Sequence, residues 1–213
     1  LLDFSKAFDT VDHDLLIAKL KYLHLSDSAV TWFDSYLRGR QQYVSFNNRS
    51  SSWRYVRAGV PQGSVLGPLL FSVYINDIST VLKHCRYHLY ADDFQIYLHS
   101  TPDSINNCLD KLNRDLMSVY NWSTSFGLNL NPNKSQAIIL GQQRLLTTVN
   151  RSLFLNVTIN NTVIPFTSSV RNLGLFLDSS LNWNIQVKHI CKKTFSILHS
   201  LRRLQKFLPF PLK

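Results

Sequence analysis

The 213-residue chain carries a formal charge of +10 and has an isoelectric point near 9.7. Apolar residues make up 45% of the sequence and charged residues 17%, which excludes an intrinsically disordered chain. The longest apolar stretch, residues 65–75, is interrupted by glycine, proline and serine and is too short to span a bilayer, so no membrane partner is expected. A cationic, globular chain favours a polyanionic partner such as nucleic acid.

Apolar periodicity and turn residues divide the first hundred residues into strands and helices. Asp12 marks the start of one helix, where an acid complements the helix dipole, Ser26 is a suitable N-cap for the next, and Pro68 suits the first turn of a third. The predicted elements are a strand over residues 1–4, helices over 12–23 and 26–38, a hairpin whose strands 42–46 and 53–56 flank the turn 47–52, a helix from 68 to 82, and two strands within 88–98.

The second half combines a long helix, several short strands and a final basic helix. Thr101-Pro102 opens the long helix and Gly127 closes it. The further predicted elements are a strand over residues 137–140, a hairpin over 157–166 that turns at Asn160-Asn161, one strand over 170–177, and a helix with Ile190, Ile197 and Leu201 on one face that ends at Pro209. Because strands and helices mix without strict alternation, the predicted fold class is α+β, an antiparallel sheet backed by helices.

Tyr90-Ala91-Asp92-Asp93 places two adjacent carboxylates on a tight turn between apolar strands. Adjacent carboxylates repel each other, and a divalent cation is the natural group to offset that repulsion. Because successive side chains of a strand point to opposite faces, a third carboxylate is needed, and Asp3 at the end of the first strand is the candidate. Three such ligands suit two Mg²⁺ ions, with Mn²⁺ as an alternative, in a phosphoryl-transfer site. The other interpretation is a solvated turn, where aspartate is common.

Three segments resemble, in order, the first three palm motifs of reverse transcriptases, and two later segments resemble the fourth and fifth. They are Asp3-Phe4-Ser5-Lys6-Ala7-Phe8-Asp9, the run Gly-Val-Pro-Gln-Gly-Ser-Val-Leu-Gly-Pro over residues 59–68, Tyr90-Ala91-Asp92-Asp93, residues 127–135, and Leu173-Gly174 with Trp183. The amino-acid sequences of these motifs are similar to those of non-LTR (LINE-type, jockey-like) retrotransposons. The resemblance spans nearly the whole chain and implies a reverse-transcriptase palm that adds dNTPs to a DNA primer on an RNA template.

The resemblance also implies roles for single residues. Asp3, Asp92 and Asp93 would hold the metal ions with the backbone carbonyl of Phe4, and Lys134 would protonate the departing pyrophosphate. The other implied roles are a steric gate against ribonucleotides for Phe8, nucleotide contacts for Phe4, Gln62 and Gly63, and primer contacts for Tyr90, Ala91, Leu173 and Gly174. The plainer alternatives are core packing for Phe8, a structural turn for Gln62 and Gly63, strand packing for Tyr90, and a surface position for Lys134.

Most of the surplus positive charge lies in residues 101–213, which hold 13 Lys/Arg against 4 acids, so nucleic-acid contacts are expected mainly there. The cations of the last helix resemble the start of a thumb, with a solvated helix face as the alternative. They are Lys188, Lys192, Lys193, Arg202, Arg203, Lys206 and Lys213. The expected organisation is a palm over 1–145, connecting strands of the primer-grip region over 146–180 and a partial thumb helix over 181–213, without fingers.

Two other functions stay open. A decayed element copy could bind nucleic acid without catalysis, and an RNA replicase shares the two-metal chemistry, although Phe8 disfavours it. Cys85, Cys108 and Cys191 form no C-x-x-C pair, which favours a reducing compartment and an intracellular, nuclear or cytoplasmic location. Because fingers precede the first palm motif in the family, the isolated chain is expected to extend a primer poorly.

Overall fold

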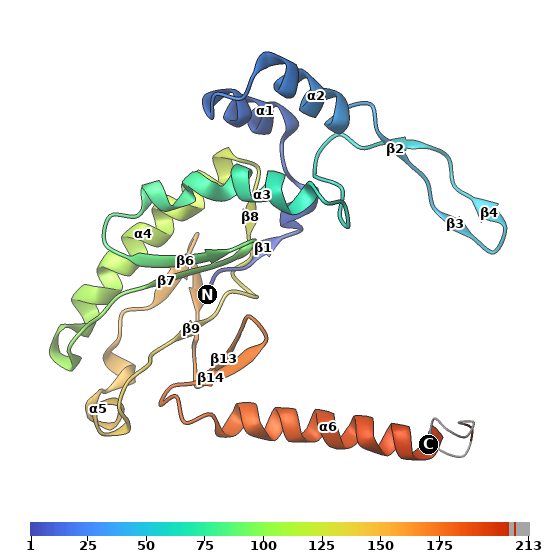
Figure 1. The fold of residues 1–213 in the computed structure, drawn as a ribbon. Coiled ribbons are helices and arrows are strands. Elements are labelled where there is room, and N and C mark those ends of the chain that lie inside the picture. Colours follow the sequence, from blue (N-terminus) through green and yellow to red (C-terminus); the bar gives the residue numbers. More distant parts are fainter. Residues whose placement is uncertain (205–206, 208–213) are drawn as a thin grey trace. The chain divides into compact units, whose positions relative to one another are not determined.

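The computed structural model describes residues 1–204 and 207 (Figure 1). The chain divides into two compact units: Leu1–Ser135 with Ser152–Pro165, and Gln136–Arg151 with Phe166–Lys213. Both units combine helices with short strands, which confirms the predicted α+β class. The division into palm, connecting strands and thumb stays a prediction.

Two helices open the first unit at the predicted starts. The carboxylate of Asp12 accepts a hydrogen bond from the Leu15 N–H at the start of α1 (His13–Tyr22), and the Ser26 hydroxyl accepts one from the Ala29 N–H at the start of α2 (Asp27–Leu37). These bonds satisfy amide groups that the first turn of a helix leaves without partners. A short 3-10 turn, η1 (Ala7–Asp9), precedes α1.

The predicted hairpin after α2 is present, but its turn is shorter than residues 47–52. Two antiparallel pairs follow one another along it: β2 (Gln41–Gln42) with β5 (Arg54–Tyr55), and β3 (Ser45–Phe46) with β4 (Arg49–Ser50). Asn47 and Asn48 have φ values of 47° and 59°, the left-handed conformation that closes a two-residue hairpin turn. Arg49 and Ser50 are therefore strand residues.

The core of the first unit lies around α3 (Gly67–Ile75), which begins near Pro68 as predicted and continues as the 3-10 helix η2 (Asn76–Val81). Phe71, Tyr74 and Ile78 on these helices are fully buried. The 3-10 turn η3 (Pro102–Ser104) leads into the long helix α4 (Ile105–Ser125), which packs against η2. Its end is followed by Gly127 at φ 65°, as the sequence predicted.

The strands of the first unit form short antiparallel pairs where one continuous sheet was predicted. They are β6 (Arg86–Tyr90) with β7 (Asp93–Tyr97), β1 (Phe4–Ser5) with β8 (Asn129–Leu130), and β10 (Val157–Ile159) with β11 (Thr162–Ile164). The last pair turns at Asn160-Asn161, as predicted. A single bridge between Leu2 and Phe94 places the chain before β1 against β7.

The second unit corrects two predictions. Residues 170–177 form the hairpin β13 (Ser169–Asn172) and β14 (Leu175–Asp178) instead of one strand, because Leu173 and Gly174 adopt φ values of 46° and 86° and reverse the chain. The strands β9 (Ala137–Ile138) and β12 (Phe166–Thr167) pair in parallel, not antiparallel.

The remaining elements of this unit are two helices and a 3-10 turn on the boundary. They are α5 (Gln143–Thr148), which was not predicted, η4 (Arg151–Leu153), and α6 (Asn184–Leu204). Pro209, the predicted end of the last helix, lies outside the described residues, as do Lys206 and Lys213. Over the described part of the chain, no helix has both the length and the apolar character that a membrane span requires.

Candidate functional site

Strand pairing brings the carboxylates of distant segments together at one edge of β7. The Leu2 N–H donates a 2.8 Å hydrogen bond to the Phe94 carbonyl. Asp3, the next residue in the chain, therefore lies close to the turn that joins β6 to β7. Tyr90 and Asp93 form the last pair of that hairpin, and Asp92 lies in the turn between them. The predicted proximity of the first strand to the Asp-Asp turn is thus present in the structure.

The three aspartates influence one another electrostatically. Burial raises the pKa of Asp3, the positive charge of Lys134 lowers it, and the negative charge of Asp92 raises it again; the net direction is upward. The pKa of Asp93 is also raised, first by desolvation and then by the charges of Asp92 and Asp3. The Oδ2 atom of Asp3 is buried and has no hydrogen-bond partner in the described structure. These groups concentrate negative charge at one place, which the positive charge of Lys134 offsets in part.

Lys134 reaches this site because the loop after β8 folds onto the first strand. The Asn131 N–H donates to the Asp3 carbonyl at 2.8 Å, and the Ser135 hydroxyl accepts a 3.2 Å bond from the Asp3 N–H. The same hydroxyl donates to the Asn131 carbonyl at 2.8 Å, which closes the loop. Lys134 lies between these anchored residues and is exposed. An exposed cation is therefore held within electrostatic range of the Asp3 carboxylate.

A cavity of about 430 Å³ in one unit and another of about 420 Å³ in the other are open to ligands. Asp92 and several of the predicted nucleotide-binding residues line the smaller cavity together. Its lining residues are Phe4, Lys6, Ala7, Phe8, Pro61, Gln62, Gly63, Gly67, Pro68 and Asp92. Volumes of this size accommodate small organic ligands.

The lining of the smaller cavity includes an aromatic residue, Phe8, and a cationic residue, Lys6. The Phe8 ring stacks on the buried ring of Phe71, with centroids 4.3 Å apart, while Phe8 also lines the cavity. Phe8 therefore packs on a core residue and also borders the cavity, and its role as a steric gate stays a prediction. Lys6 was not among the predicted site residues, although its place in the first motif, two residues before Phe8, was a usable signal.

Hydrogen bonds join the two chain segments that contribute Phe8 and Gln62 to this cavity. The Gly59 N–H donates to the Val11 carbonyl at 2.7 Å, and the Val60 N–H donates to the Phe8 carbonyl at 2.8 Å. The buried Nε2 atom of His13 lies 2.8 Å from the Gly59 carbonyl oxygen. The loop that carries Gln62 is thereby joined to the segment that carries Phe8.

Gly59→Ala should destabilise the first unit by at least about 3 kcal/mol, because strain and a backbone clash coincide there. Gly59 has φ +89°, and a Cβ atom would lie 2.8 Å from the Cα atom and carbonyl oxygen of Asp9. Chemical denaturation would measure the loss. Gly39→Ala is the matched control, since Gly39 has φ +70° and no neighbour within 4 Å. Equal losses in the two variants would contradict the close approach.

The donor set favours a hard cation, although the described side chains do not form a complete metal cage. Over these residues, no group of three or more His, Cys, Asp or Glu side chains is placed so that it could hold a metal ion. The buried, unpartnered oxygen of Asp3 and the pKa values of Asp3 and Asp93, both raised by burial and by the negative charge of Asp92, nevertheless indicate sites for positive charge. Carboxylate oxygens are the ligands that magnesium prefers.

The remaining predicted residues lie in the second unit and in the β6–β7 hairpin. Leu173 and Gly174 form the exposed turn between β13 and β14. The Tyr90 side chain, at the end of β6, is 69% exposed, so packing against the strands does not account for the choice of a tyrosine there. The basic residues of α6 are exposed and described as far as residue 204. They are Lys188, Lys192, Lys193, Arg202 and Arg203.

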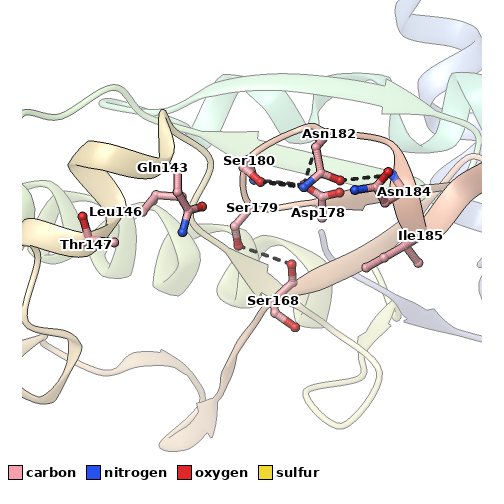
Figure 2. Close-up of a pocket in the computed structure, with 10 residues that line it drawn as sticks. All are labelled: Gln143, Leu146, Thr147, Ser168, Asp178, Ser179, Ser180, Asn182, Asn184 and Ile185. Atoms are coloured by element: carbon pink, nitrogen blue, oxygen red, sulfur yellow. Dashed lines mark hydrogen bonds between the residues drawn. The ribbon is translucent and has the colours of Figure 1, made fainter.

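The larger cavity contains none of the predicted site residues (Figure 2). Asp178 is one of its lining residues, and its Oδ1 atom accepts hydrogen bonds from the N–H and hydroxyl of Ser180 at 3.0 and 3.1 Å and from the Asn182 N–H at 3.1 Å. Burial raises the pKa of Asp178, but these hydrogen bonds outweigh it and hold the pKa below its ordinary value. The network stabilises the turn from β14 into α6.

Comparisons with known proteins agree with the motifs. Residues 1–177 match the family described as reverse transcriptase (RNA-dependent DNA polymerase). The chain is 32% identical over 208 residues to the RNA-directed DNA polymerase from mobile element jockey of Drosophila funebris, covering 94% of this chain and 21% of that protein. It is 31% identical over 212 residues to the probable RNA-directed DNA polymerase from transposon BS of Drosophila melanogaster, covering 95% and 22%. The chain thus spans about a fifth of the length of these curated relatives.

Proposed function

Because this chain belongs to the reverse transcriptase (RNA-dependent DNA polymerase) family, we propose that it is the polymerase domain of a jockey-like, non-LTR retrotransposon. It would add deoxynucleotides to the 3′-hydroxyl of a DNA primer on an RNA template. The observation that carries the proposal is the position of Asp3 beside Asp92 and Asp93, at a cavity lined by Phe8 and Gln62. Carboxylates next to a nucleotide-sized cavity are what a two-metal phosphoryl transfer requires.

The carboxylates are proposed to hold two Mg²⁺ ions, with Mn²⁺ as an alternative. Asp3 and Asp92 would be the main ligands, assisted by Asp93 and by the backbone carbonyl of Phe4. When bound, the ions supply Lewis-acid stabilisation of the phosphoryl group. Asp3 offers a buried oxygen without another partner, so ligation would satisfy it.

The cavity residues are proposed to select and orient the nucleotide. Phe8, supported from behind by Phe71, would contact the sugar and exclude a 2′-hydroxyl. Gly63 has φ +81° with open space around its Cα atom, which allows a base or sugar to approach the backbone closely. Lys6 and Gln62 line the same cavity, and the Lys6 ammonium group is suited to the triphosphate.

Nucleic acid is proposed to bind through two further groups of residues. Tyr90 at the end of β6, Ala91 in the turn after it, and the exposed turn residues Leu173 and Gly174 would contact the primer. The five described cations of α6, defined above, would neutralise phosphates. Binding of that kind is independent of sequence and weakens as the salt concentration rises.

Lys134→Ala should lower the maximal extension rate at least about tenfold and change the apparent dNTP affinity little, if Lys134 protonates the leaving pyrophosphate. The position of the loop beside Asp3 supports this role. Single-turnover kinetics over a range of dNTP concentrations would separate the two constants. Lys111→Ala, on exposed α4 surface, is the control. A loss confined to affinity would make Lys134 an electrostatic anchor.

A primer-extension assay tests the proposed function directly. The longest natural polypeptide that contains these residues would be incubated with poly(rA)·oligo(dT), dTTP and Mg²⁺. Extension of the primer supports the polymerase. Binding of the hybrid without extension under any metal would favour the non-catalytic remnant, and extension by ribonucleotides alone would favour an RNA replicase.

A further inference from the structure

Asp9 lies next to the smaller cavity, in contact with one of the residues that line it. It ends the 3-10 turn η1, immediately after Phe8. The Gln62 side chain donates a 2.9 Å hydrogen bond from its Nε2 atom to Oδ1 of Asp9. Gln62 lines the cavity and Asp9 does not, so Asp9 can act on a bound nucleotide through the side chain of Gln62.

The chemistry of this pair fixes the orientation of the glutamine amide. An ionised carboxylate can only accept hydrogen bonds, so the NH₂ end of Gln62 must face Asp9. The carbonyl oxygen of the same amide is then directed away from Asp9. Without the carboxylate, the amide could rotate and offer either end to a ligand.

Backbone contacts beside the pair hold the two chain segments together. A Cβ atom at Gly59 would lie within 2.9 Å of three Asp9 backbone atoms, so the two backbones are in direct contact. The hydrogen bonds of Gly59 and Val60 to the segment Phe8–Val11 hold that contact. Asp9 therefore lies at a fixed place relative to the start of the Gln62 loop.

We infer that Asp9 is a positioning residue of the nucleotide site, which orients the Gln62 amide so that its carbonyl oxygen is available as a hydrogen-bond acceptor for the incoming nucleotide. The inference rests on the proposed function for its kinetic consequence, whereas the orientation itself does not depend on activity. Asp9 does not touch the reacting atoms and is not a catalytic residue.

A double-mutant cycle tests the kinetic consequence in the longest natural polypeptide that contains the chain. Asp9→Ala should raise the apparent KM for dNTP about three- to tenfold and change kcat less than about twofold, the size expected for one misplaced hydrogen bond. In a Gln62→Ala background, the same Asp9→Ala change should have no further effect on KM. Asp9→Asn, which keeps the size but allows either amide orientation, should give an intermediate KM.

Asp27→Asn is the control, because Asp27 is an exposed aspartate in the first turn of α2 and lies outside the cavity lining. Multiplicative effects of Asp9→Ala and Gln62→Ala on KM would overturn the inference. So would a fall in kcat that matched a fall in the thermal unfolding midpoint, since a purely structural contact would give that pattern.

The orientation can be measured without any polymerase activity. In ¹H–¹⁵N spectra of the 213-residue chain, the side-chain NH₂ signals of Gln62 should move when Asp9 is replaced by Asn and stay in place in Asp27→Asn. Unmoved Gln62 signals would refute the inference. Moved signals in a protein that extends no primer would support the orientation and count against the proposed function alone.

Discussion

Asp92→Asn should lower the rate of primer extension at least about a hundredfold, with little loss of stability. The substitution keeps the shape of the side chain and removes one negative charge from the site that is proposed to hold the metal ions. Asp92 lines the cavity, and its negative charge raises the pKa of both Asp3 and Asp93. Its removal therefore changes the electrostatic environment of the other two proposed ligands. Asp3→Asn should produce a loss of similar size.

The stability of these variants distinguishes a metal site from a folding defect. The pKa of Asp3 is raised in the folded chain, so the ionised carboxylate destabilises the fold at neutral pH, and stability should rise as the pH falls from the folded pKa towards the unfolded one. Asp3→Asn should therefore unfold at the same or a higher temperature than the parent and lose this pH dependence. Asp103→Asn, at an exposed position in η3, should leave the extension rate unchanged. Near-full extension by Asp92→Asn would show that the catalytic assignment is wrong.

Phe8→Val should reduce the preference for deoxynucleotides over ribonucleotides at least about tenfold, because the ring is proposed to exclude the 2′-hydroxyl by contact. The stacking of Phe8 on Phe71 at 4.3 Å holds the ring in one position at the cavity wall. The smaller valine would leave room for the hydroxyl. The measurement is the ratio of kcat/KM for dTTP to that for UTP on the same primer and template.

Removal of the Phe8 ring also costs packing, and Phe71→Leu separates this effect from the gate. Phe71 is fully buried on α3 and does not line the cavity. Phe71→Leu should lower the free energy of unfolding by about 1 kcal/mol or more and leave the discrimination ratio within about twofold. If both variants changed the ratio equally, or if Phe8→Val left it unchanged, Phe8 would be a core residue and no gate.

The assignment of the chain to its family required no structure, because it depends on residue types at short spacing. Asp3 to Asp9, residues 59–68 and the Tyr-Ala-Asp-Asp turn carry the resemblance, and the matched family covers residues 1–177. The helix starts at Asp12 and Ser26 were likewise predictable. A cap or a two-residue turn is decided by hydrogen bonds and φ angles within a few residues, so a local pattern is sufficient.

Predictions failed where a short run of residues fitted more than one local structure. Most of residues 170–177 suit a strand, but Asn172 and Gly174 also suit a turn, and the left-handed angles at Leu173 and Gly174 make the run a hairpin. The turn after residue 46 was predicted too long for a related reason: serine-rich residues 49–52 suit a turn, but cross-strand pairing recruits the first two into β4. Pairing energy outweighs the weak preferences of single residues.

The sequence by itself determined the chemistry of this protein: which carboxylates, which aromatic ring and which cations are available. The tertiary structure decided which of them meet. The bridge from Leu2 to Phe94 brings Asp3 to Asp92, the contact of Gly59 with Asp9 brings Gln62 beside Phe8, and the fold of the first motif adds Lys6 to the cavity. Such contacts join residues far apart in the chain, and their register depends on burial and strand pairing across the whole unit, which no local pattern encodes.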